Sequence, residues 1–152
     1  ELLETLDRAC LVPEAVYREV VTDGIEAGYT DARRVERGVE DGTLEVVEVG
    51  ESSVVDRLER NPGLSRADVE VLACAHSRDG VAVMDEAIGR SAAAVEDIET
   101  RGTAFVVLSA VSNGAISPED GRTAIDAMTE EGWYVAPDLY AKIVRKLESF
   151  ER

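Results

Sequence analysis

Two adjacent acids, Asp85 and Glu86, directly follow the apolar run VAVM at residues 81–84. Carboxylates at the end of an apolar strand are well placed to bind a ligand, because ligands of open parallel α/β sheets bind beyond the carboxyl ends of the strands. Alternatively, the two acids only stabilise the N-terminus of the next helix, where the helix dipole favours negative charge. Acids elsewhere in the chain favour the first interpretation.

Asp68 borders an apolar face in the stretch LSRADVEVLACA, residues 64–75. It precedes Leu72 by four residues and Ala75 by seven, so the three share one side of a helix. Asp68 also fits the third position of a capping box that begins at Ser65. The two roles are compatible, because an inward carboxylate at a helix N-terminus can meet the edge of a sheet.

Glu19 follows Val16 by three residues and flanks a second apolar stripe, although taken alone it has the pattern of a surface acid. Glu70 points away from the apolar face, and we expect it to be solvated. Glu19, Asp68 and Asp85 therefore lie on separate elements, and none has an obvious basic partner. Mg²⁺ and Mn²⁺ prefer such oxygen ligands, and a metal pair held by acids is the usual apparatus for cleaving a phosphodiester.

The elements that position these acids alternate between helix and strand. Strands are predicted at residues 10–12, 44–49, 81–84, near 98 and at 133–135. Helices are predicted at residues 1–8 (a helix end), 13–22, 30–39, 54–60, 65–77, 87–95, 103–113, 117–132 and 137–149. The predicted strands are separated by helices, and the strand at residues 81–84 is apolar throughout. This pattern favours a parallel sheet covered on both faces. We therefore predict an α/β fold.

The charge of the chain is strongly negative, with 32 acids against 16 bases and a net charge of −16. The acids are spread along the chain, which indicates a solvated surface rather than a disordered tail. Abundant acids, scarce lysine and many Val and Ala residues resemble proteins of halophiles, in which molar salt screens repulsion beyond about 3 Å. In such salt a negative surface no longer excludes a nucleic-acid partner.

The length of 152 residues fits one domain with its own core. No stretch resembles a signal peptide or a membrane span. Cys10 and Cys74 match no ligand spacing and are expected to be reduced thiols of a cytoplasmic protein. His76 is the only histidine and lies late in an Ala-rich helix, which disfavours a Ser-His or Cys-His mechanism.

Four segments, taken in order, resemble a prokaryotic branch of the PIN-domain family: LVPEAVYREVV, LSRADVEVLACA, VAVMDEAIGRSAA and ISPEDGRTAIDAMTEEGWYVAPDLYAKIV. The last segment is the most distinctive and resembles the C-terminal two-helix extension of that branch, here residues 115–152. The resemblance implies a three-layer α/β/α sandwich with a parallel central sheet, formed by a single domain over residues 1–152. It also implies a metal-dependent endoribonuclease that acts on RNA.

The resemblance assigns Mg²⁺ or Mn²⁺ ligand roles to Glu19, Asp68 and Asp85, which would be the catalytic acids. Glu86 matches a frequent second acid of the metal site. Arg90 matches a frequent basic position, from which it would contact a substrate phosphate. A salt bridge on the helix surface is the alternative role for Arg90.

The family pattern begins with an apolar strand that ends in Asp followed by Ser or Thr, and the chain has no such stretch. We expect this strand to be missing from the N-terminus of the sequence. Two alternatives to the free-standing enzyme follow. One is a non-catalytic PIN-like module that binds RNA or protein, and the other is the toxin of a toxin–antitoxin pair, which would bind an antitoxin protein.

The C-terminal region also predicts a homodimer. Residues 103–114 read TAFVVLSAVSNG, so this helix is apolar around most of its circumference and must be buried on several sides. Trp133, Tyr134, Tyr140 and Phe150 add aromatic surface, which is enriched in interface cores. The alternative is a monomer whose C-terminal helices pack on its own sheet.

Overall fold

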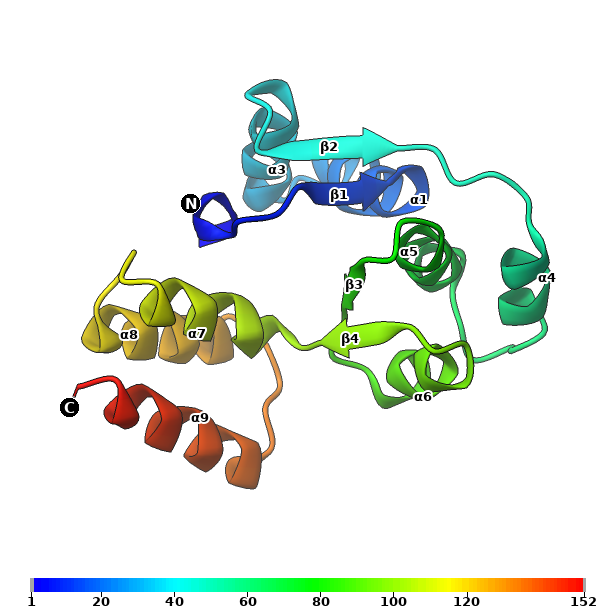
Figure 1. Ribbon diagram of the computed structural model, residues 1–152. Helices are drawn as coiled ribbons and strands as arrows, with labels where there is room; N and C mark the ends of the chain where they lie inside the picture. Colours follow the sequence, from blue (N-terminus) through cyan, green and yellow to red (C-terminus); the bar gives the residue numbers. More distant parts are fainter. Residues whose placement is uncertain (1, 152) are drawn as a thin grey trace. The chain divides into compact units, whose positions relative to one another are not determined.

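The computed structural model describes residues 2–151 and divides into two compact units. Ala9–Arg101 form one unit, here called the sheet unit. The helical unit joins the described residues before Ala9 to those after Arg101. Figure 1 traces the elements of both units. The single domain over residues 1–152, with an extension at residues 115–152, remains a prediction.

The strands of the sheet unit form two parallel pairs. β1 (Cys10–Pro13) pairs with β2 (Leu44–Val47), and β3 (Val81–Val83) pairs with β4 (Glu99–Arg101) (Figure 1). Helices connect the strands of each pair, as parallel pairing requires. The predicted α/β class with parallel strands is confirmed. Within residues 2–151 the pairs are two separate sheets, so the three-layer sandwich around one central sheet remains a prediction.

Seven helical segments accompany these strands in the described part of the sheet unit. They are α1 (Glu14–Tyr17), the π-helical η2 (Arg18–Thr22), α2 (Asp23–Glu26), α3 (Thr30–Glu40), α4 (Ser53–Glu59), α5 (Arg66–Ser77) and α6 (Ala87–Val95). The first three follow one another without a break and form one helix over residues 14–26.

The predicted end of this helix at residue 22 is wrong, because the helix continues through the following Asp-Gly pair and Gly24 is a buried helical residue. A Cβ atom at Gly24 would lie 3.0 Å from the Cβ of Ala32 on α3, so the glycine permits the close approach of two helices. The predicted apolar face is also only partly buried. Val21 is 1 % exposed, whereas Val20 is 41 % exposed.

Helix α5 is central to the sheet unit, where it contacts α1, α4, β1 and β3 (Figure 1). Ser65 begins the helix as predicted, with a complete capping box. Leu72, which is fully buried, packs in a core with apolar residues of α4, β3 and α6. The position of α5 therefore fixes the elements on which the candidate acids lie.

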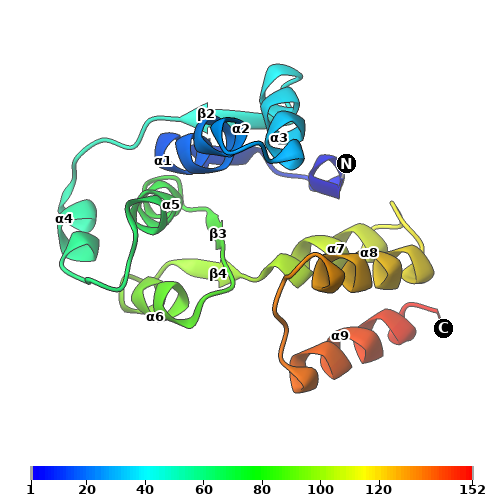
Figure 2. The ribbon, with the colours of Figure 1, turned by 180° about the vertical axis from the view of Figure 1, so that it is seen from behind.

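The helical unit contains η1 (Leu2–Thr5), a short 3₁₀ helix where the end of an α-helix was expected, and three α-helices. α7 (Thr103–Ser112), α8 (Pro118–Glu130) and α9 (Pro137–Ser149) lie side by side in Figure 2. Their core is formed by Val107, Val111, Ile125, Ile143 and Leu147.

The predicted strand at residues 133–135 is wrong, because these residues form no strand. The Trp133 N–H donates to the carbonyl of Met128 at 2.9 Å, which holds the segment against the end of α8. Trp133 packs against the core of the helical unit, whereas Tyr134 is 83 % exposed.

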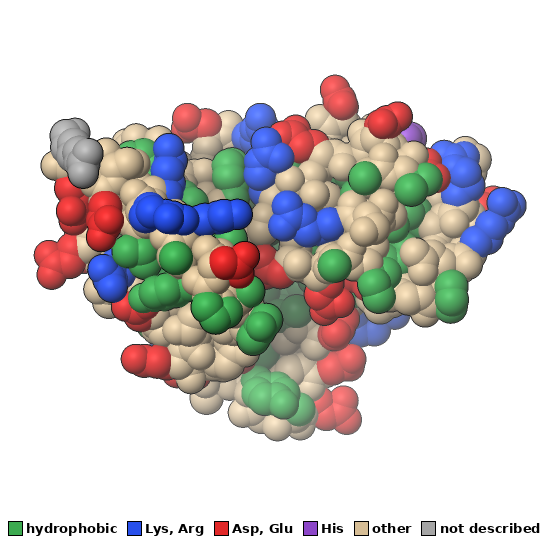
Figure 3. All heavy atoms as spheres, turned by 90° about the horizontal axis from the view of Figure 1, so that it is seen from below, with side chains coloured by type: hydrophobic (Ala, Val, Ile, Leu, Met, Phe, Trp, Pro, Cys, Tyr) green, Lys and Arg blue, Asp and Glu red, His purple; other side chains and the backbone are tan. Residues whose placement is uncertain are grey.

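Acidic side chains are spread over the face drawn in Figure 3 rather than gathered in one patch. None of the helices in residues 2–151 is long and apolar enough to cross a membrane. Cys10 is half-buried and Cys74 buried, and neither forms a disulfide among the described residues. Burial raises the pKa of the Cys10 thiol.

Candidate metal site

Glu19 is exposed and lies in the π-helical segment η2. Such a segment widens one turn of a helix and re-aims the side chains on it, and π-helical turns are frequent at functional sites. The segment contacts α1, α2 and α3. This local departure from α-helical geometry at Glu19 was not predicted from the sequence.

Asp68 is half-buried at the N-terminus of α5 and takes the capping-box role. Its backbone N–H donates to Ser65 Oγ at 3.1 Å, and its Oδ2 accepts from the Ser65 N–H at 3.0 Å. The capping box therefore engages one carboxylate oxygen of Asp68, and its Oδ1 lies outside the box. The capping interpretation is confirmed, and it leaves a possible ligand atom on the same side chain.

Asp85 and Glu86 are both exposed and connect β3 to α6. Glu86 occupies the N-cap position of α6, but its side chain accepts no capping hydrogen bond. Glu86 therefore makes no side-chain cap, and the alternative that the two acids stabilise the helix N-terminus by their charge stays a prediction. Arg90 is exposed on α6, one helical turn after Glu86.

Helix α5 carries Asp68. It contacts α1, which directly precedes the segment of Glu19, and β3, which precedes Asp85. These acids do not belong to the carboxylate group that the structure brings closest together. Among the described residues, three side chains have ligand atoms that all lie within 4.8 Å of one another, namely Glu51, Asp56 and Glu59. The assignment of Glu19, Asp68, Asp85 and Glu86 as metal ligands remains a prediction.

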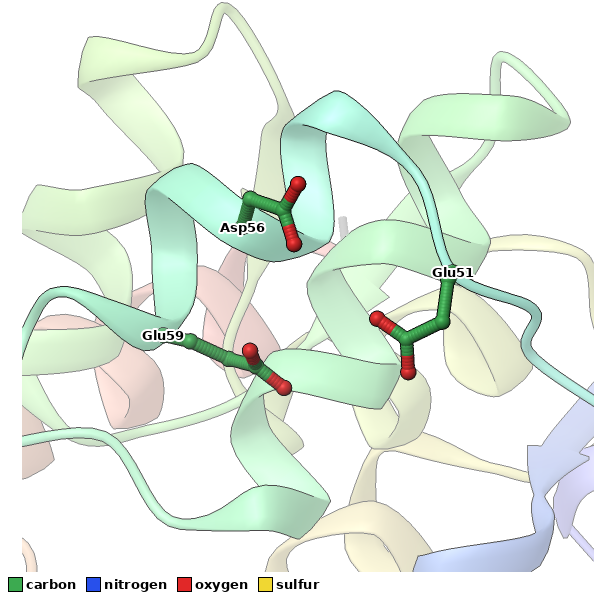
Figure 4. A group of neighbouring side chains, drawn as sticks. All are labelled: Glu51, Asp56 and Glu59. Carbon is green, nitrogen blue, oxygen red and sulfur yellow. The ribbon is translucent and has the colours of Figure 1, made fainter.

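The three closely spaced acids lie on α4 and just before it, are all exposed and point toward one another in Figure 4. Two of the three acids already have a basic partner, because the guanidinium of Arg66 forms ion pairs with Glu59 and, at 3.9 Å, with Glu51. The sequence signal for this group was the spacing of Asp56 and Glu59 by three residues on one helix. Sequence reasoning missed the group because Glu51 lies before the helix, and its place beside Asp56 and Glu59 depends on how the chain enters α4.

Glu70 is buried, at 8 % exposure, and the prediction that it is solvated is wrong. Its Oε1 accepts from the backbone N–H of Ala15 at 3.1 Å, and its Oε2 accepts from Arg66 Nε at 2.9 Å. The hydrogen bond to Glu70 is the largest of the interactions that raise the pKa of Arg66. The packing of α5 against α1 buries this position, and Arg66, one turn earlier, supplies the compensating charge.

A family model described as a PIN domain matches residues 1–149 of the chain. No curated protein matches the chain, and no solved structure does.

Proposed function

Since the chain belongs to the PIN-domain family, we propose that it is an endoribonuclease that hydrolyses RNA with the help of Mg²⁺ or Mn²⁺. PIN domains are in general nucleases that need a divalent metal ion. The observation that carries the proposal is the family match, which extends over nearly the whole chain. Three carboxylates support it: Asp68 lies on α5, and Glu19 and Asp85 follow elements that contact α5.

The proposed ligands fit a hard divalent cation by their chemistry. Glu19 and Asp85 are exposed, and Asp68 is half-buried with one carboxylate oxygen outside its capping box. Every donor is a carboxylate oxygen, the type that Mg²⁺ and Mn²⁺ prefer over thiolate and imidazole. Glu86, which is not used as a side-chain cap, would add a further oxygen donor beside Asp85.

A bound ion would activate water and stabilise the charge that develops on the leaving oxygen of the phosphodiester. Glu19, Asp68 and Asp85 would act as ligands rather than as nucleophiles. Arg90 would bind a phosphate of the RNA, because a guanidinium matches phosphate oxygens in geometry and charge. The Ser65 cap orients the Asp68 carboxylate before any ion binds.

The test is the melting temperature with and without Mn²⁺ in molar KCl. A ligand at about 100 times its Kd stabilises the folded state by about 2.7 kcal/mol, so the shift is measurable. We expect Asp85→Asn to reduce the shift and a Glu19→Gln, Asp68→Asn, Asp85→Asn variant to abolish it. An unchanged shift in the triple variant would refute the site.

The closely spaced acids of Figure 4 provide a matched control. A Glu51→Gln, Asp56→Asn, Glu59→Gln variant removes as many negative charges as the first triple variant. We expect it to keep the Mn²⁺ shift and the Mn²⁺-dependent cleavage of RNA. Loss of both in this variant alone would place the metal site on α4.

A further inference from the structure

Glu70 is the one charged side chain that is buried among residues 2–151, and the proposed reaction gives it no role. A buried carboxylate is costly unless hydrogen bonds and a counter-charge compensate it. Both Glu70 oxygens are compensated, one by the N–H of Ala15 and the other by Arg66. A leucine at this position would avoid the cost, so the carboxylate calls for an explanation beyond packing.

The hydrogen bond from Ala15 joins two elements that are distant in the sequence. Ala15 is the second residue of α1, and N–H groups in a first helical turn have no acceptor within their own helix. Pro13 occupies the N-cap and offers no side-chain acceptor. Glu70 of α5 therefore caps a helix that lacks a local cap, across a separation of 55 residues.

Two of the proposed metal ligands lie close to the two ends of this link. Glu19 follows Ala15 by four residues, about one helical turn, in the same continuous helix. Asp68 precedes Glu70 by two residues in the first turn of α5. A bond that fixes α1 against α5 therefore also fixes the backbone at Glu19 relative to the backbone at Asp68.

Arg66 holds the Glu70 carboxylate in place from the other side. Its Nε donates to Glu70, and its terminal nitrogens form ion pairs with Glu51 and Glu59. Glu51 and Glu59 are thus counter-charges of the terminal nitrogens of Arg66, whereas the bond to Glu70 is made by Nε. This arrangement gives the exposed acids a role that requires no metal ion.

We propose that Glu70 is a positioning residue of the metal site, which fixes the helix that carries Glu19 against the helix that carries Asp68. This inference rests on the proposed function. Glu70 itself binds neither the metal nor the RNA. Its effect is transmitted through the N–H of Ala15 and the helix that begins there.

The test is the Kd for Mn²⁺, measured by isothermal titration calorimetry in molar KCl at a temperature where circular dichroism shows every variant to be folded. We expect Glu70→Leu to weaken binding roughly tenfold, the lower end of the effect of residues that orient metal ligands. Glu70→Gln should bind more weakly than the wild type but more tightly than Glu70→Leu, because its amide oxygen can still accept from Ala15 while its NH₂ group would face the donor Nε of Arg66. Glu59→Gln, the matched control, removes an Arg66 partner without touching α1 and should leave the Kd unchanged.

A purely structural role for Glu70 would lower the melting temperature of Glu70→Leu and leave the Kd of the folded protein unchanged, which would overturn the inference. If Glu70→Leu does not fold, Glu70→Asp replaces it, since the shorter side chain keeps the charge but loses the reach to Ala15. Binding by Glu70→Asp at wild-type affinity would overturn the inference equally. A wild-type protein that binds no Mn²⁺ would instead refute the proposed function, and the inference with it.

Discussion

Replacement of Gly121 by alanine tests the packing of the helical unit most directly. Gly121 is buried in α8, where it faces α7 and α9. A Cβ atom at this position would lie 2.6 Å from Val111 Cγ2 and 3.1 Å from Leu147 Cδ2. Carbon atoms are at optimal separation near 3.5–4.0 Å, so the helices would have to move apart.

The expected loss of stability is the difference of two effects. Overpacking a filled core costs about 1–3 kcal/mol, and here relief by rotation is restricted because the β-branched Val111 has one preferred rotamer in a helix. The substitution also stabilises α8 by about 0.5–1 kcal/mol, because alanine is a better helix former than glycine. We therefore expect Gly121→Ala to lower the free energy of unfolding by about 1–2 kcal/mol.

Urea unfolding in molar KCl measures this loss, with the fluorescence of Trp133 as a probe of the helical unit. Gly38→Ala on α3 is the matched control, because its Cβ would meet only Leu44, at 3.4 Å. We expect this control to be stabilising by about 0.5–1 kcal/mol, followed by circular dichroism. Adding Val111→Ala should relieve the clash, with a coupling energy of about 1 kcal/mol. A Gly121→Ala variant as stable as the wild type would refute the close packing of α8.

Three further predictions concern charge and assembly. With a net charge of −16, we expect partial unfolding in dilute buffer and recovery in molar KCl; equal circular dichroism at both salt concentrations would contradict the halophilic interpretation. Hydrogen bonds from Arg57, at 2.9 Å to each oxygen of Glu96, lower the pKa of that carboxyl. Their stabilisation is therefore complete above the ordinary Glu pKa of about 4.3 and is lost as the pH falls through the lowered value. Arg57→Met should flatten this part of the melting-temperature profile, and an unaltered acid slope would contradict the assignment. We also propose a homodimer through the helical unit, where Tyr134 is 83 % and Leu139 45 % exposed; a monomer mass by light scattering at all micromolar concentrations would refute it.

Helix boundaries could be predicted wherever the signal was local. Ser65 and Ser117 accept hydrogen bonds from N–H groups three residues later, in agreement with the predicted capping box at Ser65 and the predicted helix start at residue 117. Helix α9 begins at Pro137, also as predicted. The sequence failed at Gly24, because an Asp-Gly pair normally ends a helix and the close contact with Ala32 is a tertiary feature.

The candidate site shows the same division between local and tertiary information. The capping role of Asp68 followed from its spacing to Ser65 and is confirmed. Glu70 was expected to be solvated because it lies off the apolar face of its own helix. Its acceptor role depends on Ala15, 55 residues away, and no pattern within α5 could indicate that partner. Only Arg66, four residues earlier, was a local sign that this carboxylate is compensated.

Proximity of carboxylates is a weak criterion for a metal site in this chain, because 32 acids share its surface with 16 bases. The closest group, Glu51, Asp56 and Glu59, includes two acids that already pair with Arg66. A divalent ion about 4 Å from that guanidinium would meet a repulsion of roughly 2 kcal/mol in water of low ionic strength, roughly thirtyfold in affinity, and molar salt would screen much of it. The ion would also compete with Arg66 for the same oxygens. The ion pairs of Arg66 therefore count against Glu51 and Glu59 as metal ligands, whatever the distances between the acids, and Glu19, Asp68 and Asp85 remain the proposed ligands.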